Sequence, residues 1–272
     1  MKTSIYVFSG TGTSLAIAKK IGNKLGNVDI LSIPNELKKA DGNEIKVKNS
    51  KVGFIFPCYF GEIPAIVLEF IRKINLDNTN YIFSVVTCGG NAGYSIKFLA
   101  RELEYKSKKL DYGKSMAVTS NYIVAWYYSA ICIKGKKLKK ALEILDYKVA
   151  QVSEDVANGK NEVEKSRYIF YKIPHIISPK EVVKDTRKWD IEFSTDEKCN
   201  GCSICYKVCP VQNIKMKNNK PEFQHNCQRC MACIQYCPNN AIRFKDRSLD
   251  KTKYFHPEIP VKEMIKFVHE NK

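Results

Sequence analysis

The sequence "CNGCSICYKVCP" occupies residues 199–210, and a second version of it, "CQRCMACIQYCP", follows at residues 227–238. The two segments are 28 positions apart, and all four cysteines and the proline after them recur in register. They hold eight of the chain's eleven cysteines, while Cys58, Cys88 and Cys132 are dispersed. In a chain that we expect to be intracellular, this density of thiols favours metal binding over disulfide bonds.

Each segment has the spacing C-x2-C-x2-C-x3-C-P, which resembles the bacterial ferredoxins that carry two [4Fe–4S] clusters. The short intervals allow one tight turn to present three thiolates to one cluster, and the fourth cysteine is directed to the cluster of the other segment. We therefore expect two crossed sets of ligands. The first set is Cys199, Cys202, Cys205 and Cys237, and the second is Cys227, Cys230, Cys233 and Cys209.

Zinc is the alternative metal, because paired C-x2-C segments also form zinc ribbons. A zinc ribbon rarely has a third interval of this type in the same run, so the spacing favours iron–sulfur clusters. Ligand sets made only of cysteine, with no histidine, indicate low reduction potentials. The chemistry expected of this part of the chain is one-electron transfer.

Residues 1–158 alternate between strand-like and helix-like segments, which predicts a doubly wound parallel sheet of five strands. The predicted strands cover residues 3–8, 28–33, 51–57, 81–88 and 113–120, and helices are expected over residues 14–25, after Pro64, over 91–108 and from about Leu138 to Val156. Ligands of such sheets bind beyond the carboxyl ends of the strands. The loops that begin at Ser9, Pro57 and Thr87 should therefore converge there.

The stretch "FSGTGTS" at residues 8–14 lies between the first predicted strand and the first helix, where phosphates commonly bind. It is not a Walker loop, because no lysine follows Gly12 at the required place. A dinucleotide site is disfavoured because the third glycine and the acid after the second strand are missing. Hydroxyls and backbone N–H groups could instead hold a phosphate without any cation. The residues concerned are Ser9, Thr11, Gly12, Thr13 and Ser14.

This loop resembles the S-x-T-G-x-T phosphate loop of the flavodoxin family, with matches at Ser9, Thr11 and Gly12. Thr13 and Ser14 replace the usual Asn-Thr and keep a hydroxyl at both places. The resemblance implies bound FMN and two further loops at the flavin ring. The first loop contains Pro57, Cys58, Tyr59, Phe60 and Gly61, and the second contains Thr87, Cys88, Gly89, Gly90, Asn91 and Gly93.

Tyr59 or Phe60 is the candidate for stacking on the flavin, although core packing is an equally good interpretation of each ring. The family often has an aromatic residue on the second loop, and here none precedes Tyr94. One face of the flavin is therefore expected either to be less covered or to be covered by "NYIVAWYY" at residues 121–128. Cys58 and Cys88 are interpreted as small buried side chains rather than redox thiols.

The two halves together resemble flavodoxin–ferredoxin fusion proteins of anaerobes. The implied organisation is an FMN domain at residues 1–158, a packed connector at 159–195, a 2[4Fe–4S] ferredoxin domain at 196–246 and a tail with a short helix at 247–272. The predicted function is the relay of single electrons between the clusters and FMN, for which the protein supplies position and electrostatics. The alternative is an enzyme whose flavin reduces a small molecule and is then reduced again by electrons that pass from ferredoxin through the clusters.

Charge and length limit the partners. The chain has 272 residues, 44% of them hydrophobic, and a net charge of +17, which favours acidic partners. Because the lysines are scattered and no nucleic-acid-binding motif accompanies them, we expect an acidic redox protein and no nucleic acid. The longest apolar run, residues 122–133, is too short to span a bilayer, and no signal peptide is recognisable, so a cytoplasmic protein is predicted.

Overall fold

The computed structural model describes the chain except for residues 1, 125–131, 166–186, 246–252 and 270–272. The chain divides into two compact units, which we call the sheet unit and the cysteine unit. The sheet unit consists of Met1–Phe8, Ser14–Thr119 and Ile133–Ile176. The cysteine unit consists of Ser9–Thr13, Ser120–Cys132 and Ile177–Lys272. The loop Ser9–Thr13 therefore makes its contacts mainly with the cysteine unit, although strand and helix of the sheet unit flank it in sequence.

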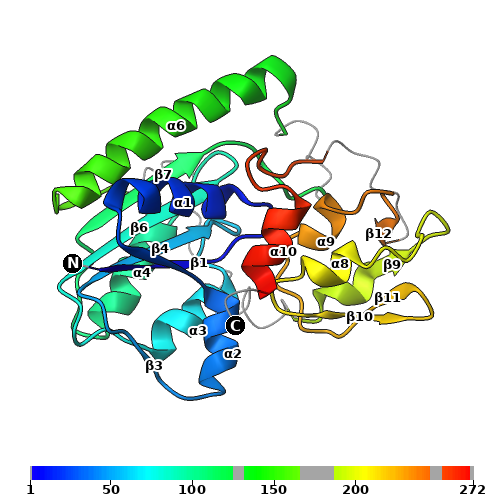
Figure 1. Cartoon of the computed structure of the whole chain (residues 1–272), viewed down its shortest axis with the longest axis horizontal. Helices are drawn as coiled ribbons and strands as arrows, with labels where there is room; N and C mark the ends of the chain where they lie inside the picture. The colour runs from blue at the N-terminus through cyan, green and yellow to red at the C-terminus, as the bar shows by residue number, and fades with distance from the viewer. Residues whose placement is uncertain (1, 125–131, 166–186, 246–252, 270–272) are drawn as a thin grey trace, which may run out of the picture. The chain divides into compact units, whose positions relative to one another are not determined.

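A parallel sheet of six strands, in the order β2-β1-β4-β6-β7-β8, forms the centre of the sheet unit (Figure 1). The strands are β1 (Thr3–Val7), β2 (Val28–Ser32), β4 (Lys51–Pro57), β6 (Tyr81–Cys88), β7 (Tyr112–Ala117) and β8 (Glu162–Val163). Counted without the sixth strand, this is the 2-1-3-4-5 order of the flavodoxin-like fold. The predicted fold class is confirmed, and the switch in strand order lies between β1 and β4.

The sixth strand, β8, is an addition to the five strands predicted from the sequence. Its two residues pair in parallel with Tyr112 and Gly113 of β7. Glu162 forms ion pairs with Lys114 and Lys160, so the side-chain contacts of this residue at the edge of the sheet are between charged groups. A strand of two exposed residues has no apolar alternation, which explains why the sequence pattern gave no sign of it.

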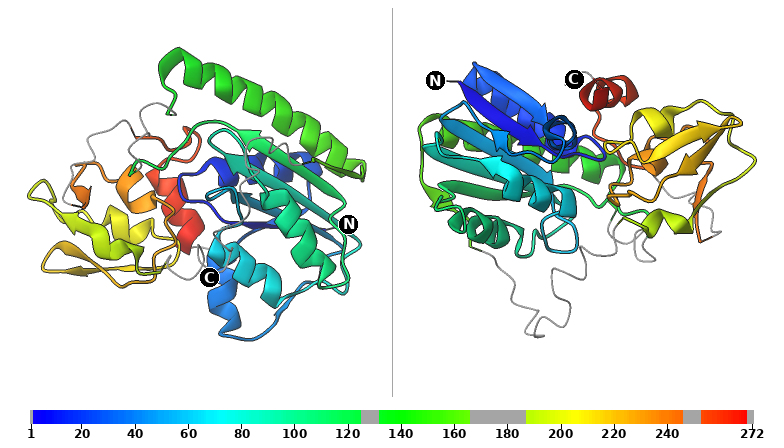
Figure 2. Two further views of the ribbon diagram at one scale, coloured as in Figure 1. Left: turned by 180° about the vertical axis from the view of Figure 1, so that it is seen from behind. Right: turned by 90° about the horizontal axis from the view of Figure 1, so that it is seen from below.

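Helices cover both faces of this sheet. Those of the sheet unit are α1 (Thr13–Leu25), α2 (Ile33–Ala40), α3 (Ala65–Lys73), α4 (Ser95–Glu104) and α6 (Gly135–Ala157). Figures 1 and 2 show α1 and α6 on one face and α2, α3 and α4 on the other. The Lys20–Asp146 ion pair joins α1 to α6. A small parallel pair, β3 (Ile45–Lys46) and β5 (Ile74–Asn75), lies outside the main sheet.

The cysteine unit has an internally repeated structure. It contains a 3-10 helix (Trp189–Glu192), β9 (Phe193–Thr195), α8 (Ile204–Lys207), β10 (Ile214–Lys217), β11 (Lys220–Phe223), α9 (Ala232–Gln235), β12 (Ile242–Phe244) and α10 (Val261–His269). Antiparallel pairs form between β10 and β11 and between β12 and β9. The helices α8 and α9 start 28 positions apart, so the repeat in the sequence is also a repeat in the backbone.

The core of the cysteine unit surrounds the cysteine segments. Phe193, Ile214, Ile234 and Phe244 are buried there together with Cys205 and Cys209. Trp189 packs against Phe244, with 4.8 Å between ring centroids. The predicted short helix of the tail is present as α10. No helix in the described residues is long and apolar enough to cross a membrane.

Candidate iron–sulfur centres and phosphate loop

Two cavities of the cysteine unit are lined by the two predicted sets of cysteines. The first has Cys199, Cys202, Cys205 and Cys237 in its wall, and the second has Cys209, Cys227, Cys230 and Cys233. Their empty volumes, about 340 and 360 Å³, are nearly equal. The fourth cysteine of each repeat thus lines the cavity of the other repeat, which is the arrangement that crossed ligation requires.

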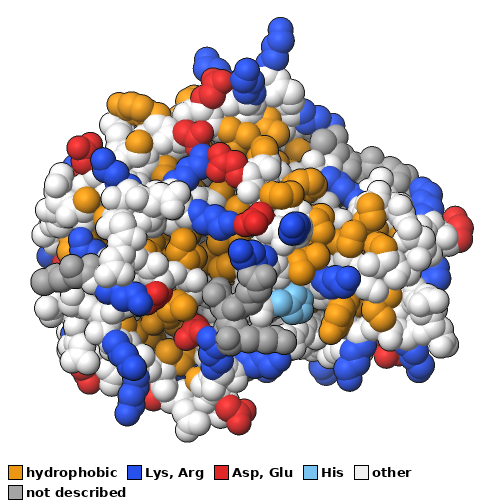
Figure 3. Space-filling model, viewed as in Figure 1, with side chains coloured by type: hydrophobic (Ala, Val, Ile, Leu, Met, Phe, Trp, Pro, Cys, Tyr) orange, Lys and Arg blue, Asp and Glu red, His pale blue; other side chains and the backbone are white. Residues whose placement is uncertain are grey.

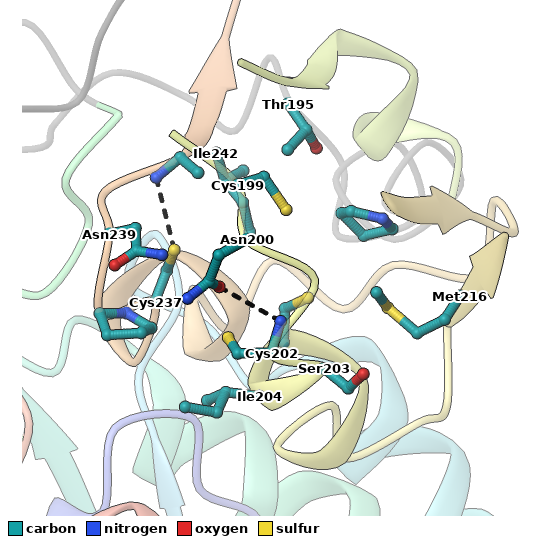
Figure 4. A pocket seen from close by; sticks show the side chains of 14 residues that line it. Thr195, Cys199, Asn200, Cys202, Ser203, Ile204, Met216, Cys237, Asn239 and Ile242 are labelled. Atoms are coloured by element: carbon teal, nitrogen blue, oxygen red, sulfur yellow. Dashed lines mark hydrogen bonds between the residues drawn. The ribbon is translucent and has the colours of Figure 1, made fainter. Parts of the chain in front are cut away.

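Local backbone geometry places the cysteines around each cavity. Ser203 and Met231, at equivalent positions of the two repeats, both have φ of 62°, and each directly precedes a short helix. This left-handed residue turns the chain between the second and third cysteines of its repeat. Figure 4 shows the result for the first cavity, where Cys199 and Cys202 come from the first repeat and Cys237 comes from the second.

Backbone N–H groups donate hydrogen bonds to sulfur atoms of both repeats. Asn213 donates to Cys209 Sγ at 3.2 Å, Ala241 to Cys237 Sγ at 3.4 Å, and Arg229 to Cys227 Sγ at 3.3 Å. The first two bonds are equivalent in the repeat. Such bonds stabilise negative charge on sulfur and are one of the means by which proteins tune cluster potentials.

The donor set suits a positively charged core. Burial raises the pKa of Cys205 to about 11 and that of Cys227 to about 12, and it also raises the pKa of Cys209, Cys230 and Cys233. Thiolates in such surroundings need a cation beside them. In the described part of the chain, no three Cys, His, Asp or Glu side chains are grouped closely enough to hold a single metal ion. The four sulfurs of each predicted set line one shared cavity.

Residues 192–238 match the family model of the 4Fe-4S dicluster domain. This part of the chain is a dicluster domain. The match includes all eight cysteines of the two repeats, and the domain carries two [4Fe–4S] clusters. It covers a minority of the chain, so it identifies the dicluster domain and not the whole protein. No curated protein matches the sequence.

Several solved structures are similar to part of this chain at low sequence identity. A putative flavoprotein from Bacteroides eggerthii is 21% identical, with 49% of this chain and 99% of that chain covered and a TM-score of 0.34. An azoreductase from Bacillus anthracis is 12% identical, with 57% and 100% covered and a TM-score of 0.40. A flavodoxin from the domain Archaea is 13% identical, with 57% and 99% covered and a TM-score of 0.32. At these scores the likenesses carry no functional argument.

The loop predicted to bind phosphate is rich in buried hydroxyls. The side chains of Ser9, Thr11, Thr13 and Ser14 are all buried. Gly12 has φ of +90°, a backbone conformation that favours glycine, and its N–H donates to Ser9 Oγ at 3.1 Å. Thr13 is the first residue of α1, whose first turn contains no acidic residue. A phosphate ester suits this place, because hydroxyls surround a helix N-terminus whose first turn carries no carboxylate.

The loop is bonded to residues that the sequence reasoning did not single out. Asn121 Nδ2 donates to Thr11 Oγ1 at 2.8 Å, and the His256 N–H donates to the Thr11 carbonyl at 2.8 Å. The Tyr254 hydroxyl lies 3.0 Å from Thr13 Oγ1. Asn121 and Tyr254 stand more than a hundred positions from the loop in sequence, and no spacing pattern connects them to it.

The two loops predicted to contact the flavin ring lie side by side in the sheet unit. The Cys58 N–H donates to the Thr87 carbonyl at 2.7 Å, and the Tyr94 N–H donates to the Gly61 carbonyl at 2.7 Å. The backbones are so close that a Cβ on Gly93 would lie 2.4 Å from the Gly61 Cα. The Ser14 hydroxyl is 3.0 Å from that of Thr87, which connects the start of α1 to the second loop.

Other residues of these loops differ in exposure and packing. Tyr59 packs edge-on against Phe8, whereas Phe60 is 54% exposed, so Phe60 is the better stacking candidate. Asn91 accepts a hydrogen bond from the Gly93 N–H. Pro57 and Cys88 end their strands partly exposed, and Gly89 and Gly90 are exposed. Burial raises the pKa of the Cys58 thiol, and it raises the pKa of Cys88 to about 12, so both thiols keep their protons at neutral pH.

The covering segment predicted at residues 121–128 is only partly described, because residues 125–128 lie outside the described residues. Within its described part, Tyr122 stacks on Trp189 of the cysteine unit, with 5.9 Å between ring centroids. Coverage of a flavin face by this segment stays a prediction.

Proposed function

We propose that the protein relays single electrons between its two [4Fe–4S] clusters and an FMN bound at the carboxyl ends of β1, β4 and β6. Ligands of doubly wound sheets bind where the strand order reverses, and here the reversal lies between β1 and β4. The loops that follow β1, β4 and β6 supply the hydroxyls, the exposed Phe60 and the close glycine contacts described above. Bound FMN would supply one- and two-electron redox chemistry.

In this proposal the residues of the chain bind and orient the flavin. Ser9, Thr11, Thr13 and Ser14 would hold the phosphate with the N-terminus of α1. The stretches Pro57–Gly61 and Thr87–Gly93 would contact the ring with backbone groups and with Phe60. No lysine or arginine is required at the phosphate, because the hydroxyls and the N–H groups of the helix terminus act as donors.

One observation carries the link between flavin and clusters. A Cβ added to Gly10 would lie 2.2 Å from the carbonyl oxygen of Cys230 and 2.9 Å from its Cβ. The proposed phosphate loop therefore touches the backbone of a predicted cluster ligand, and both belong to the cysteine unit. A flavin held by this loop is bound next to the polypeptide that holds the second cluster, which favours electron exchange between the two cofactors.

The cofactor content of anaerobically purified protein tests the proposal. We expect about eight irons and about one FMN per chain, because each of the two clusters contains four irons. Zinc in place of iron would contradict the cluster assignment. If the protein contained both clusters but did not bind FMN, it would be an electron-transfer protein without the proposed relay.

The partner that we propose is an acidic redox protein. The chain has a formal net charge of +17. On the face shown in Figure 3, Lys and Arg side chains are dispersed, and Asp and Glu side chains lie among them. A broad positive field of this kind speeds the approach of an acidic protein, but it does not define one binding patch.

A further inference from the structure

A C-terminal segment, Tyr254–Ile259, packs on the proposed phosphate loop within the cysteine unit. The Tyr254 side chain is buried, and its hydroxyl lies 3.0 Å from Thr13 Oγ1. The side chain of Ile259 lies against Gly12, where an added Cβ would be 2.7 Å from Ile259 Cβ. Together with the bond from the His256 N–H to the Thr11 carbonyl, these contacts place one tyrosine hydroxyl at the start of α1.

A chain of hydrogen bonds from the dicluster domain fixes this tyrosine. Gln235, which ends α9 and is buried, accepts from the Tyr254 N–H at 2.9 Å through Oε1. Its Nε2 donates to the Asn121 carbonyl at 2.6 Å, and the Asn121 amide in turn donates to Thr11 Oγ1 at 2.8 Å. Tyr236, which follows Gln235, donates its hydroxyl to the Ile259 carbonyl at 2.9 Å. Gln235 thus holds the segment directly and the loop through Asn121, while Tyr236 holds the segment at Ile259.

The chemistry of the Tyr254 hydroxyl suits an anion. Burial raises the pKa of Tyr254 to about 12, so the group keeps its proton at neutral pH and can donate it in a hydrogen bond. It lies beside Thr13, where the unpaired N–H groups and the positive end of the α1 dipole favour negative charge.

We propose that Tyr254 is a phosphate-binding residue of the FMN site, and that Asn121 and Gln235 are positioning residues for it and for Thr11. The inference rests on the proposed function, because it needs FMN as the ligand of the loop. Tyr254 adds a donor that the flavodoxin-like loop does not contain. The dicluster domain thereby contributes to the affinity for the flavin as well as to its oxidation and reduction.

Comparison of FMN with riboflavin tests this role, because riboflavin has the same ring and lacks the phosphate. The experiment uses full-length anaerobic protein with clusters retained and flavin removed, and measures both dissociation constants by quenching of flavin fluorescence. Tyr254→Phe should weaken FMN binding about tenfold or more, the loss of one hydrogen bond to a charged group, and should leave riboflavin binding unchanged. Tyr206→Phe, which removes a half-exposed hydroxyl in the same unit, should bind both as the wild type does.

The iron content of each variant shows whether the dicluster domain is intact. Equal weakening of FMN and riboflavin by Tyr254→Phe would overturn the role in phosphate binding, since it would mean a general effect on the loop. Tighter FMN binding would also overturn it, because the segment would then obstruct the site. An unchanged FMN affinity would overturn this inference alone. Wild-type protein that binds no FMN would overturn the proposed function and this inference with it.

Discussion

Gly10 of the proposed phosphate loop lies against the backbone of the dicluster domain. Gly10→Ala would place a methyl group 2.2 Å from a backbone oxygen of Cys230, and a backbone atom cannot move aside as a flexible side chain can. We expect the variant to be less stable by about 1–3 kcal/mol, the usual cost of overpacking. It should also purify with less FMN and less iron, which flavin and iron analysis per chain will show.

Gly90→Ala is the matched control for this substitution. Gly90 lies in the second flavin loop, and a Cβ added there meets no atom within 4 Å. It should therefore keep wild-type stability and iron content. If Gly10→Ala also kept both cofactors at wild-type levels, this result would contradict the close approach of Gly10 to the backbone of Cys230.

Crossed ligation makes a separate prediction for single cysteines. Cys237→Ser should remove the cluster that also uses Cys199, although Cys237 belongs to the second repeat. The iron content should fall from about eight to about four per chain, and the electron paramagnetic resonance spectrum of the reduced variant should match that of Cys199→Ser. Cys88→Ser, outside both sets, should keep the full iron content. A Cys237→Ser spectrum that matched Cys227→Ser instead would show that each repeat binds its own cluster.

The cysteines that line the two cavities and the buried hydroxyl residues of the loop could be singled out from the sequence, because both stand at local spacings. Four cysteines at fixed short intervals can be recognised without knowledge of the fold, and so can a glycine turn after an apolar strand. Tyr254 and Asn121 could not be recognised. Each reaches the loop through tertiary contacts across more than a hundred positions, and a single tyrosine or asparagine has no distinguishing spacing pattern.

At the scale of elements, α10 is the part of the tail whose stability can be tested. Its buried residues are Met264, Phe267 and Val268, and His269 Nε2 lies 2.9 Å from the Lys207 carbonyl of α8. Met264→Ala removes a fully buried side chain and should lower the free energy of unfolding by about 2–5 kcal/mol. Urea unfolding followed by circular dichroism measures this change. Lys262→Ala, on the exposed face of the same helix, should have little effect, and equal effects of the two would contradict the packing of α10.

Most sheet-unit elements were predictable because apolar residues recur with the period of a strand or a helix. The exceptions have physical reasons. The helix α2 is short and begins at Ile33 with Pro34 next, so it shows barely two turns of pattern. The long helix α6 is buried only from Leu145 onward, and Leu138 and Leu142, which continue the same apolar spacing toward the start of the helix, are partly exposed. Periodicity shows which face of a helix is apolar, but not how far along the helix a neighbour covers it.

At the scale of the whole molecule, the net charge predicts how a partner approaches. The rate at which an acidic, reduced ferredoxin reduces the protein should fall steeply as salt is raised from low to physiological concentration, because salt screens the attraction between opposite charges. Stopped-flow absorbance measures this rate. Reduction by a small uncharged donor serves as the control and should depend little on salt. A rate that rose with salt would contradict an acidic partner.

The central claim is that electrons pass between the clusters and FMN inside one molecule. Flash reduction of anaerobic protein with fewer than one electron per chain tests it most directly, with absorbance recorded at wavelengths specific to cluster and flavin. We expect that an electron first placed on one cofactor moves to the other at a rate independent of protein concentration. A transfer rate proportional to protein concentration, or no transfer at all, would contradict the relay.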